Sequence, residues 1–181
     1  MAFELRGQRV IVRDWRDSDL PAWVAMNADP EVRRYFNGTL SEEQALGEAG
    51  RIRAHAEQHG FTFWALEIPG VADFAGFVGL LRTSYETPFT PCVEIGWRLS
   101  RATWGKGYAS EAARLCLDYG FEQLGLDEIV AMTTVTNTPS RAVMERIGMT
   151  RNPADDFNHP FLEAGHPLQA HVLYRKRKGQ P

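Results

Sequence analysis

The chain is poor in cysteine, has no excess of basic residues and contains no long hydrophobic run. Its two cysteines, Cys92 and Cys116, are too few for the disulfide framework of a small secreted protein. The 20 Lys and Arg residues are outnumbered by 23 Asp and Glu residues, so a nucleic-acid partner is not expected. No apolar run approaches membrane-spanning length, and residues 1–7 lack a signal core. We therefore expect a cytoplasmic protein that binds neither nucleic acid nor membranes.

The length of 181 residues suits a single domain that covers 1–181 and buries a sizeable core. The basic C-terminal tail, 177–181, is expected to be frayed. We expect four large aromatic side chains to lie in the core: Trp15, Trp23, Phe36 and Trp64. The sequence is compatible with a monomer or a homodimer.

Hydrophobic periodicity and turn residues divide the chain into strands and helices. Strand patterns cover 8–13, 61–68, 74–85, 92–99, 128–136, 149–151 and 169–177. Helix patterns cover 17–26, a short segment from Asp29, 41–60, 107–124 and 138–147, whereas 152–167 is irregular. Because helices separate some strands and hairpins join others, we expect an α/β (α+β) fold. It should have a mixed sheet of about six to seven strands, with helices on both faces.

The most informative segment is a glycine-rich loop that leads directly into the helix pattern 107–124. It consists of Trp104, Gly105, Lys106, Gly107, Tyr108, Ala109 and Ser110. A helix that opens from such a loop presents unpaired backbone N–H groups and the positive end of its dipole at one point. Because that combination suits a phosphate group, we predict that these residues bind a phosphate-containing cofactor.

Two common phosphate loops do not fit this segment. A Walker A motif requires a glycine where the chain has Ser100, and Ser or Thr where it has Gly107. A dinucleotide-binding fingerprint requires a third glycine where the chain has Ser110. The loop therefore indicates neither a P-loop nucleotidase nor a Rossmann dehydrogenase.

A second motif, N-T-P-S-R-A-V-M-E-R-I-G-M, occupies 137–149, directly after a strand pattern. Taken locally, Asn137 or Ser140 caps a helix whose first turn holds Pro139, and Gly148 ends that helix. The local interpretation is compatible with a binding role for the same residues.

Together these segments resemble the GNAT acyltransferase superfamily. W-G-K-G-Y-A resembles its pyrophosphate loop, Gln/Arg-x-x-Gly-x-Gly/Ala, although Trp104 departs from the first position. The segment 137–149 resembles the family's Asn-x-x-Ser/Ala motif followed by Glu-x-x-Gly-Phe/Met. V-E-I-G-W-R-L, residues 93–99, resembles the A-E-I-G-Y-x-L strand of the Rim-type branch, which acetylates N-termini of ribosomal proteins. The resemblance covers essentially the whole chain.

The resemblance implies a fold and a co-substrate. The sheet should splay between its fourth and fifth strands, and acetyl-CoA should bind there with its pyrophosphate on the glycine-rich loop. Asn137 and Ser140 should lie along the pantetheine arm, and the N–H groups of Trp97 and Leu99 should pair with the pantetheine amides. Gly96 is costly inside a strand, so we expect a bulge or a close ligand at that point.

The family's reaction implies transfer of an acetyl group to an amine. Glu94 is our candidate for the general base, because it lies on the strand expected to hold the thioester. The alternative is that Glu94 pairs with an arginine or faces solvent. Many family members place a tyrosine in the Asn-motif helix to protonate the thiolate, but Met144 stands there in this chain. Ser140 or water is therefore the candidate acid.

The acceptor is the least defined part of the hypothesis. The branch resemblance favours a peptide N-terminal amine, and the alternatives are a small-molecule amine or antibiotic and a catalytically silent acyl-CoA sensor. Tyr35 and Phe36 stand where the family builds an acceptor lid, and 155–162 is expected to be a substrate-side loop or a dimer contact. Three histidines lie near this loop with no zinc-binding spacing, so we expect no metal: His159, His166 and His171.

Overall fold

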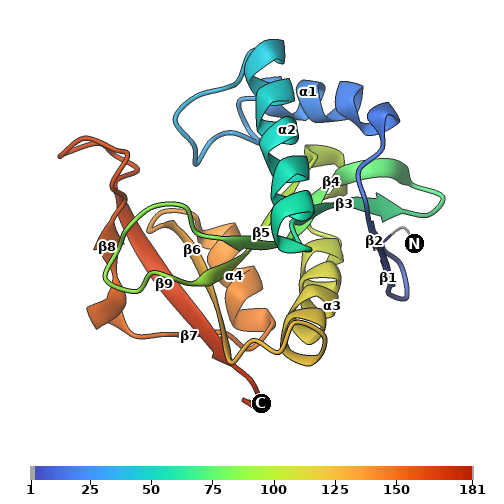
Figure 1. Ribbon diagram of the computed structural model, residues 1–181. Coiled ribbons are helices and arrows are strands. Elements are labelled where there is room, and N and C mark those ends of the chain that lie inside the picture. Colours follow the sequence, from blue (N-terminus) through green and yellow to red (C-terminus); the bar gives the residue numbers. More distant parts are fainter. Residues whose placement is uncertain (1–2, 181) are drawn as a thin grey trace.

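The computed structural model describes residues 3–180 and shows one sheet with helices against both faces (Figure 1). The strands are β1 (Glu4–Arg6), β2 (Ile11–Arg13), β3 (Phe63–Ile68), β4 (Ala72–Arg82), β5 (Val93–Leu99), β6 (Glu128–Thr134), β7 (Thr150–Arg151), β8 (Phe157–Asn158) and β9 (Ala170–Arg177). The helices are α1 (Leu20–Ala28), α2 (Glu42–His59), α3 (Tyr108–Glu122) and α4 (Thr138–Arg146). Short 3-10 helices occupy Asp17–Asp19, Arg101–Thr103 and Pro153–Asp155.

The strand order is β1-β2-β3-β4-β5-β6-β9-β7, and β8 pairs with β9. Every neighbouring pair is antiparallel except β5 and β6, which run parallel and are in register only at Glu94 and Val130. These two strands are the fourth and fifth of the sequence prediction. Beyond Glu94 they diverge, which confirms the expected splay and leaves an edge of β5 unpaired.

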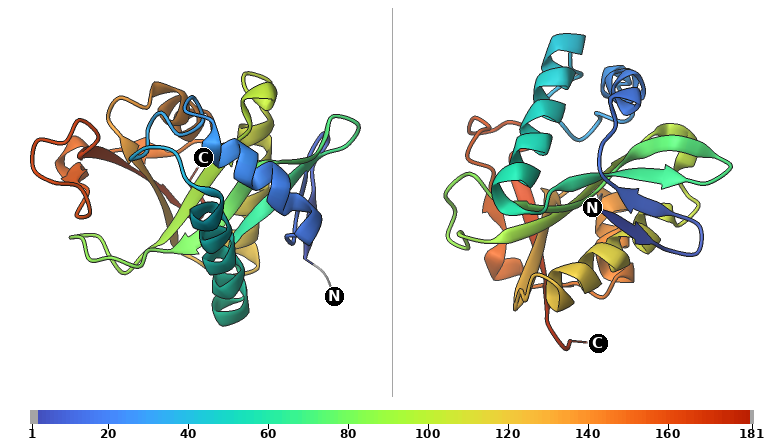
Figure 2. Two further views of the ribbon diagram at one scale, coloured as in Figure 1. Left: turned by 90° about the horizontal axis from the view of Figure 1, so that it is seen from above. Right: turned by 45° about the vertical axis from the view of Figure 1, so that its right-hand side comes forward.

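The two faces of the sheet are covered by different helix pairs, as Figure 2 shows in its right-hand view. On one face, α1 and α2 pack their apolar residues against Phe77 of β4, with Trp23 fully buried between them. On the other face, α3 and α4 pack against the centre of the sheet, with Cys116 and Met144 buried. The mixed fold with helices on both faces is therefore confirmed.

Within residues 3–180, the sheet has nine strands rather than the expected six to seven. The first predicted strand, 8–13, is shortened to β2, and an unpredicted strand, β1, precedes it in a hairpin where the Gly7 N–H donates to the Val10 carbonyl at 2.9 Å. The irregular segment 152–167 contributes the two-residue strand β8. No helix starts at Asp29, because the stretch after it forms isolated turns that end at Gly38, which has a φ of +80°.

Two further expectations change in the structure. Phe36 is 39% exposed rather than part of the core. The tail through residue 180 is hydrogen-bonded rather than frayed: Lys178 donates from its N–H to Asp127 and from Nζ to the Phe121 carbonyl, both at 2.9 Å. Pro181 lies outside the described residues. Within residues 3–180, no helix is both long and apolar enough to span a bilayer.

Candidate active site

The glycine-rich loop presents a run of free backbone donors. Gly105 and Gly107 have φ values of +72° and +82°, which non-glycine residues rarely adopt. Along the loop and the first turn of α3, backbone hydrogen bonding begins at Glu111, whose N–H donates to the Gly107 carbonyl at 3.1 Å. Within the described chain, the N–H groups of residues 105–110 have no acceptor. The N-terminus of α3 is therefore an uncapped helix end with free backbone donors, an arrangement that can accept an anion.

Arg9, in the β1–β2 hairpin, holds this loop in place. Its Nη1 donates to the Lys106 carbonyl at 2.9 Å, and its Nε donates to Glu111 at 2.8 Å. The Arg9 N–H reaches the same carboxylate at 2.7 Å. Sequence reasoning missed Arg9, because nothing local shows that a hairpin 97 residues away contacts the loop.

Most side chains of the loop already contact other groups of the protein. The indole N–H of Trp104 donates to the Leu99 carbonyl at 2.8 Å, and Lys106 Nζ donates to the Ala102 carbonyl at 3.1 Å. The buried Ser110 hydroxyl accepts from Arg146 at 3.2 Å. Tyr108 lies under the Arg9 guanidinium, 5.0 Å from the ring centroid, and Ala109 is half-buried. What this segment offers a ligand is therefore backbone N–H groups.

The free edge of β5 leads from this loop toward the point of splay. The Ser100 N–H donates to Ala75 at 2.8 Å, on the β4 side. Because N–H direction alternates along a strand, those of Trp97 and Leu99 point to the opposite side, where β5 and β6 diverge. Both predicted edge residues thus lie between the glycine-rich loop and Glu94, at an unpaired strand edge.

Gly96 is explained by packing rather than by a bulge. The β4–β5 register runs without interruption from Val93 to Leu99. A Cβ at Gly96 would lie 2.8 Å from Cζ of Phe63, so the glycine makes room for this ring. The expectation of a bulge is wrong, and the close neighbour is a side chain of the protein.

Glu94 lies at the splay, half-buried on the sheet face that carries α1 and α2. Burial raises the pKa of its carboxyl group from 4.5 to about 7. Among the described residues, none donates a hydrogen bond to this carboxylate or forms an ion pair with it. It is therefore neither paired with an arginine nor fully solvated, and its pKa suits proton transfer at neutral pH.

Asn137 and Ser140 open α4 beyond the β6 strand. The Asn137 Oδ1 accepts from the Ser140 N–H at 3.3 Å, and its Nδ2 donates to Thr133 at 2.9 Å. One amide hydrogen and one oxygen lone pair stay available for a ligand. The Ser140 hydroxyl has no partner among the described residues, whereas Met144 is 2% exposed and packs into the core.

The loop 155–162 packs beside the start of β5. Phe157, His159 and Phe161 form a ring cluster with Tyr85 and His171, in which the His159 and His171 centroids are 4.9 Å apart. The Tyr85 hydroxyl donates to Met132 Sδ at 2.9 Å. Burial lowers the pKa of His171 to about 4, so this histidine is neutral. In the described chain, no three His, Cys, Asp or Glu residues are grouped to hold a metal.

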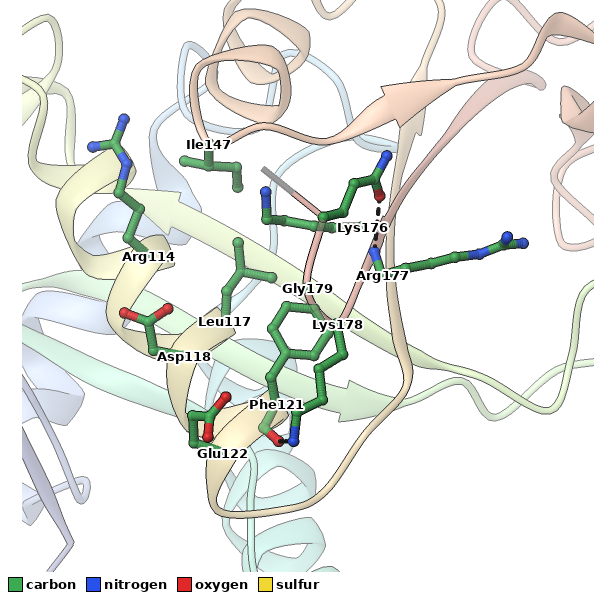
Figure 3. Close-up of a pocket in the computed structure, with 11 residues that line it drawn as sticks. Arg114, Leu117, Asp118, Phe121, Glu122, Ile147, Lys176, Arg177, Lys178 and Gly179 are labelled. Carbon is green, nitrogen blue, oxygen red and sulfur yellow. Dashed lines mark hydrogen bonds between the residues drawn. The ribbon is translucent and has the colours of Figure 1, made fainter.

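A cavity of about 350 Å³ lies away from these residues, between α3, the end of α4 and the C-terminal segment (Figure 3). Charged side chains line its rim, and Lys178 closes one side through its bond to the Phe121 carbonyl. None of the predicted site residues lines it.

Comparisons with known proteins identify the family and the fold of this chain. A model of the acetyltransferase (GNAT) domain matches residues 9–150. An FsC-acetyl coenzyme A-N(2)-transacetylase of Aspergillus fumigatus is 34% identical over 134 residues, which cover 70% of this chain and 56% of that protein. A GNAT-family acetyltransferase structure from Bacillus anthracis superposes with a TM-score of 0.78 at 26% identity, covering 97% and 98% of the two chains.

The structure of RimL, a ribosomal alpha-N-protein acetyltransferase, has the same fold. Its TM-score is 0.75 at 17% identity, covering 98% of this chain and 95% of that one. The resemblance to the Rim-type branch thus extends to the architecture. With the domain match over most of its length, this chain belongs to the GNAT family of acetyltransferases.

Proposed function

We propose that this protein transfers the acetyl group of acetyl-CoA to a peptide N-terminal amine, with Glu94 as the general base. Membership of the family makes the chain an acetyltransferase. The observation that carries the finer proposal is the position of Glu94. It is an unpartnered carboxylate whose pKa is raised to about 7, at the single residue where β5 and β6 still pair.

The chain supplies a binding track for acetyl-CoA from the glycine-rich loop to Glu94. The free N–H groups of residues 105–110 would hold the pyrophosphate, and those of Trp97 and Leu99 would hold the pantetheine amides. Asn137 would add a hydrogen bond from α4. When bound, acetyl-CoA supplies a thioester carbonyl that is open to attack by an amine.

Glu94 would take the proton that the amine must lose. An α-amine has a pKa of about 7.7–8.0, so at neutral pH much of it arrives protonated. A carboxylate with a pKa of about 7 is matched to accept that proton. The neutral amine nitrogen then bonds to the acetyl carbon and loses its second proton to solvent, and the bond between that carbon and sulfur breaks.

The departing thiolate then needs a proton. Met144 has no proton to donate and is buried in the core. The free hydroxyl of Ser140 is the nearest candidate from the Asn-motif helix, and water is the alternative. Because a coenzyme A thiolate is a good leaving group, we expect the contribution of Ser140 to be small.

Two acceptor classes are favoured by different relatives. RimL is a ribosomal alpha-N-protein acetyltransferase, and its fold favours a peptide N-terminus. The name of the FsC-acetyl coenzyme A-N(2)-transacetylase mentions FsC and no ribosomal protein, so we keep a small-molecule amine as the second acceptor class. A silent acyl-CoA sensor would bind acetyl-CoA but acetylate neither class.

The dependence of kcat/KM on pH tests the role of Glu94. Acceptor amines of different basicity are compared in wild type and Glu94→Gln. In wild type, the rising limb should lie near the Glu94 pKa of about 7 whichever amine is used. In the variant, it should follow the amine's own pKa, and kcat/KM at neutral pH should fall by roughly 10²–10⁴-fold. An unchanged rate and profile in the variant would remove Glu94 from the reaction.

A further inference from the structure

Two buried arginines flank one aromatic ring of the segment that follows α1. The guanidinium carbons of Arg33 and Arg98 lie 4.5 Å and 4.3 Å from the centroid of the Phe36 ring. Each arginine is only 8% exposed. The two positive groups are therefore close neighbours in a place from which most water is excluded.

The charges around this ring do not balance. Arg98 pairs with Glu48 at 3.1 Å and donates to Asn27 at 2.8 Å, yet its Nε is buried without a partner. Arg33 has one side-chain hydrogen bond, from Nε to the Gly38 carbonyl at 2.9 Å, and forms no ion pair within the described chain. The carboxylate of Glu48 is thus the counter-ion shared by the guanidinium groups of Arg98 and Arg33.

The imbalance is large enough to affect the pKa of Arg33. Burial and the charge of Arg98 together lower the pKa of Arg33 to about 10, far below the usual value for arginine. Burying an unpaired charge is costly, and proteins normally provide a counter-ion. A negatively charged group at this position would relieve the cost.

This arginine pair lies on the same sheet face as the proposed base. Side chains alternate along a strand, so Glu94, Gly96 and Arg98 of β5 all face α1 and α2. The Phe63 ring covers Gly96 and stacks on Phe77, with centroids 4.6 Å apart. On this face of the sheet, the surface between Glu94 and Arg98 is therefore apolar. It has a carboxylate at one end and an excess of positive charge at the other.

We propose that Arg33, beside Arg98, binds a carboxylate of the acceptor, so that the preferred acceptor is a peptide with an acidic residue shortly after its N-terminal amine. This inference rests on the proposed function. Arg98 lies four residue steps along the strand from Glu94, a distance of about 13 Å. An extended peptide whose amine lies at Glu94 spans that distance in about three to four residues. The acidic side chain is therefore expected within the first few positions.

The experiment uses pairs of short peptides that differ only by Glu or Gln at one position, scanned over the first residues. Wild-type kcat/KM should favour one Glu peptide over its Gln partner by roughly 10- to 100-fold, the value of a hydrogen bond between charged groups. In Arg33→Gln, this preference should fall close to one. Arg34→Gln, an exposed neighbour on the same segment, should keep the preference.

Binding provides a second readout that does not depend on turnover. The same peptides, already acetylated at the N-terminus, are titrated calorimetrically into enzyme with coenzyme A, and the Glu peptide should bind more tightly. Equal rates and equal affinities for Glu and Gln peptides at every position would overturn the inference and leave the proposed function standing. Preferential binding of the acidic peptide without any acetyl transfer would uphold the inference and overturn the proposed function. If Arg33→Gln does not fold, equal wild-type rates and affinities for the Glu and Gln peptides would still overturn the inference.

Discussion

Replacing Glu94 with glutamine isolates the cost of a negative charge in the proposed site. In the folded chain, burial raises the pKa of Glu94 from 4.5 to about 7. Between those two values, the folded state binds more protons than the unfolded state, so stability falls as pH rises. Below about pH 4.5 the cost vanishes, and above about pH 7 it is fully present. Glutamine has nearly the same shape and no proton to lose, so the variant escapes this pH dependence.

The magnitude follows from the two pKa values. Their difference corresponds to about 3 kcal/mol when the carboxylate is fully ionised, at about 1.36 kcal/mol for each pKa unit. Glu94 is half-buried, so solvent reduces this value. We therefore expect the stability of Glu94→Gln relative to wild type to rise by about 1–3 kcal/mol between about pH 5 and pH 8. For a chain of this length, each kcal/mol moves Tm by roughly 2–4 °C.

Urea unfolding of both proteins at the two pH values measures this difference directly. Glu86→Gln, at an exposed position on the loop before β5, is the matched control for the removal of one carboxylate. A difference between Glu94→Gln and wild type that is the same at both pH values would refute the claim that ionised Glu94 is desolvated. It would also remove the physical reason for expecting a base with a pKa near neutrality.

The remaining predictions concern the acetyl-CoA track. Gly107→Val places a branched side chain at a φ of +82° beside the free N–H groups, so coenzyme A should bind far more weakly by calorimetry. Gly60→Val, at a φ of +78° in open space, should cost stability alone, and equal coenzyme A affinity in both variants would contradict the loop assignment. Asn137→Ala should weaken coenzyme A binding by about 1–2 kcal/mol, whereas Ser41→Ala, which removes a cap from α2, should lower only Tm. Arg9→Gln frees the Lys106 carbonyl and Glu111, so it should weaken coenzyme A binding, and unchanged affinity would show that the loop keeps its shape without the hairpin.

Local sequence signals were sufficient for the elements that frame the candidate site. The spacing of Gly105 and Gly107 predicted the loop that opens α3, and the helix predicted over 41–60 begins with a capping box formed by Ser41 and Gln44. Such features depend on backbone preferences within a few residues. The alternating strand around Glu94 was also recognisable, because period-two burial is a local pattern.

Features that depend on contacts between distant segments could not be predicted in this way. Arg9 reaches the loop only because the β1–β2 hairpin lies beside α3, and Gly96 is required by the ring of Phe63. Phe36 looked like a core residue from its type alone. Its partial exposure between Arg33 and Arg98 depends on the packing of the segment after α1 against β5.

The central claim is that this chain moves an acetyl group from acetyl-CoA to an amine. The most direct measurement follows thiol release and acetylated product together, in mixtures of acetyl-CoA with N-terminal peptides and small amines. The account predicts one free thiol for each N-acetylated amine, with both signals dependent on the acceptor. Tight binding of acetyl-CoA with no acetylated product from any amine would contradict it and identify the chain as a sensor.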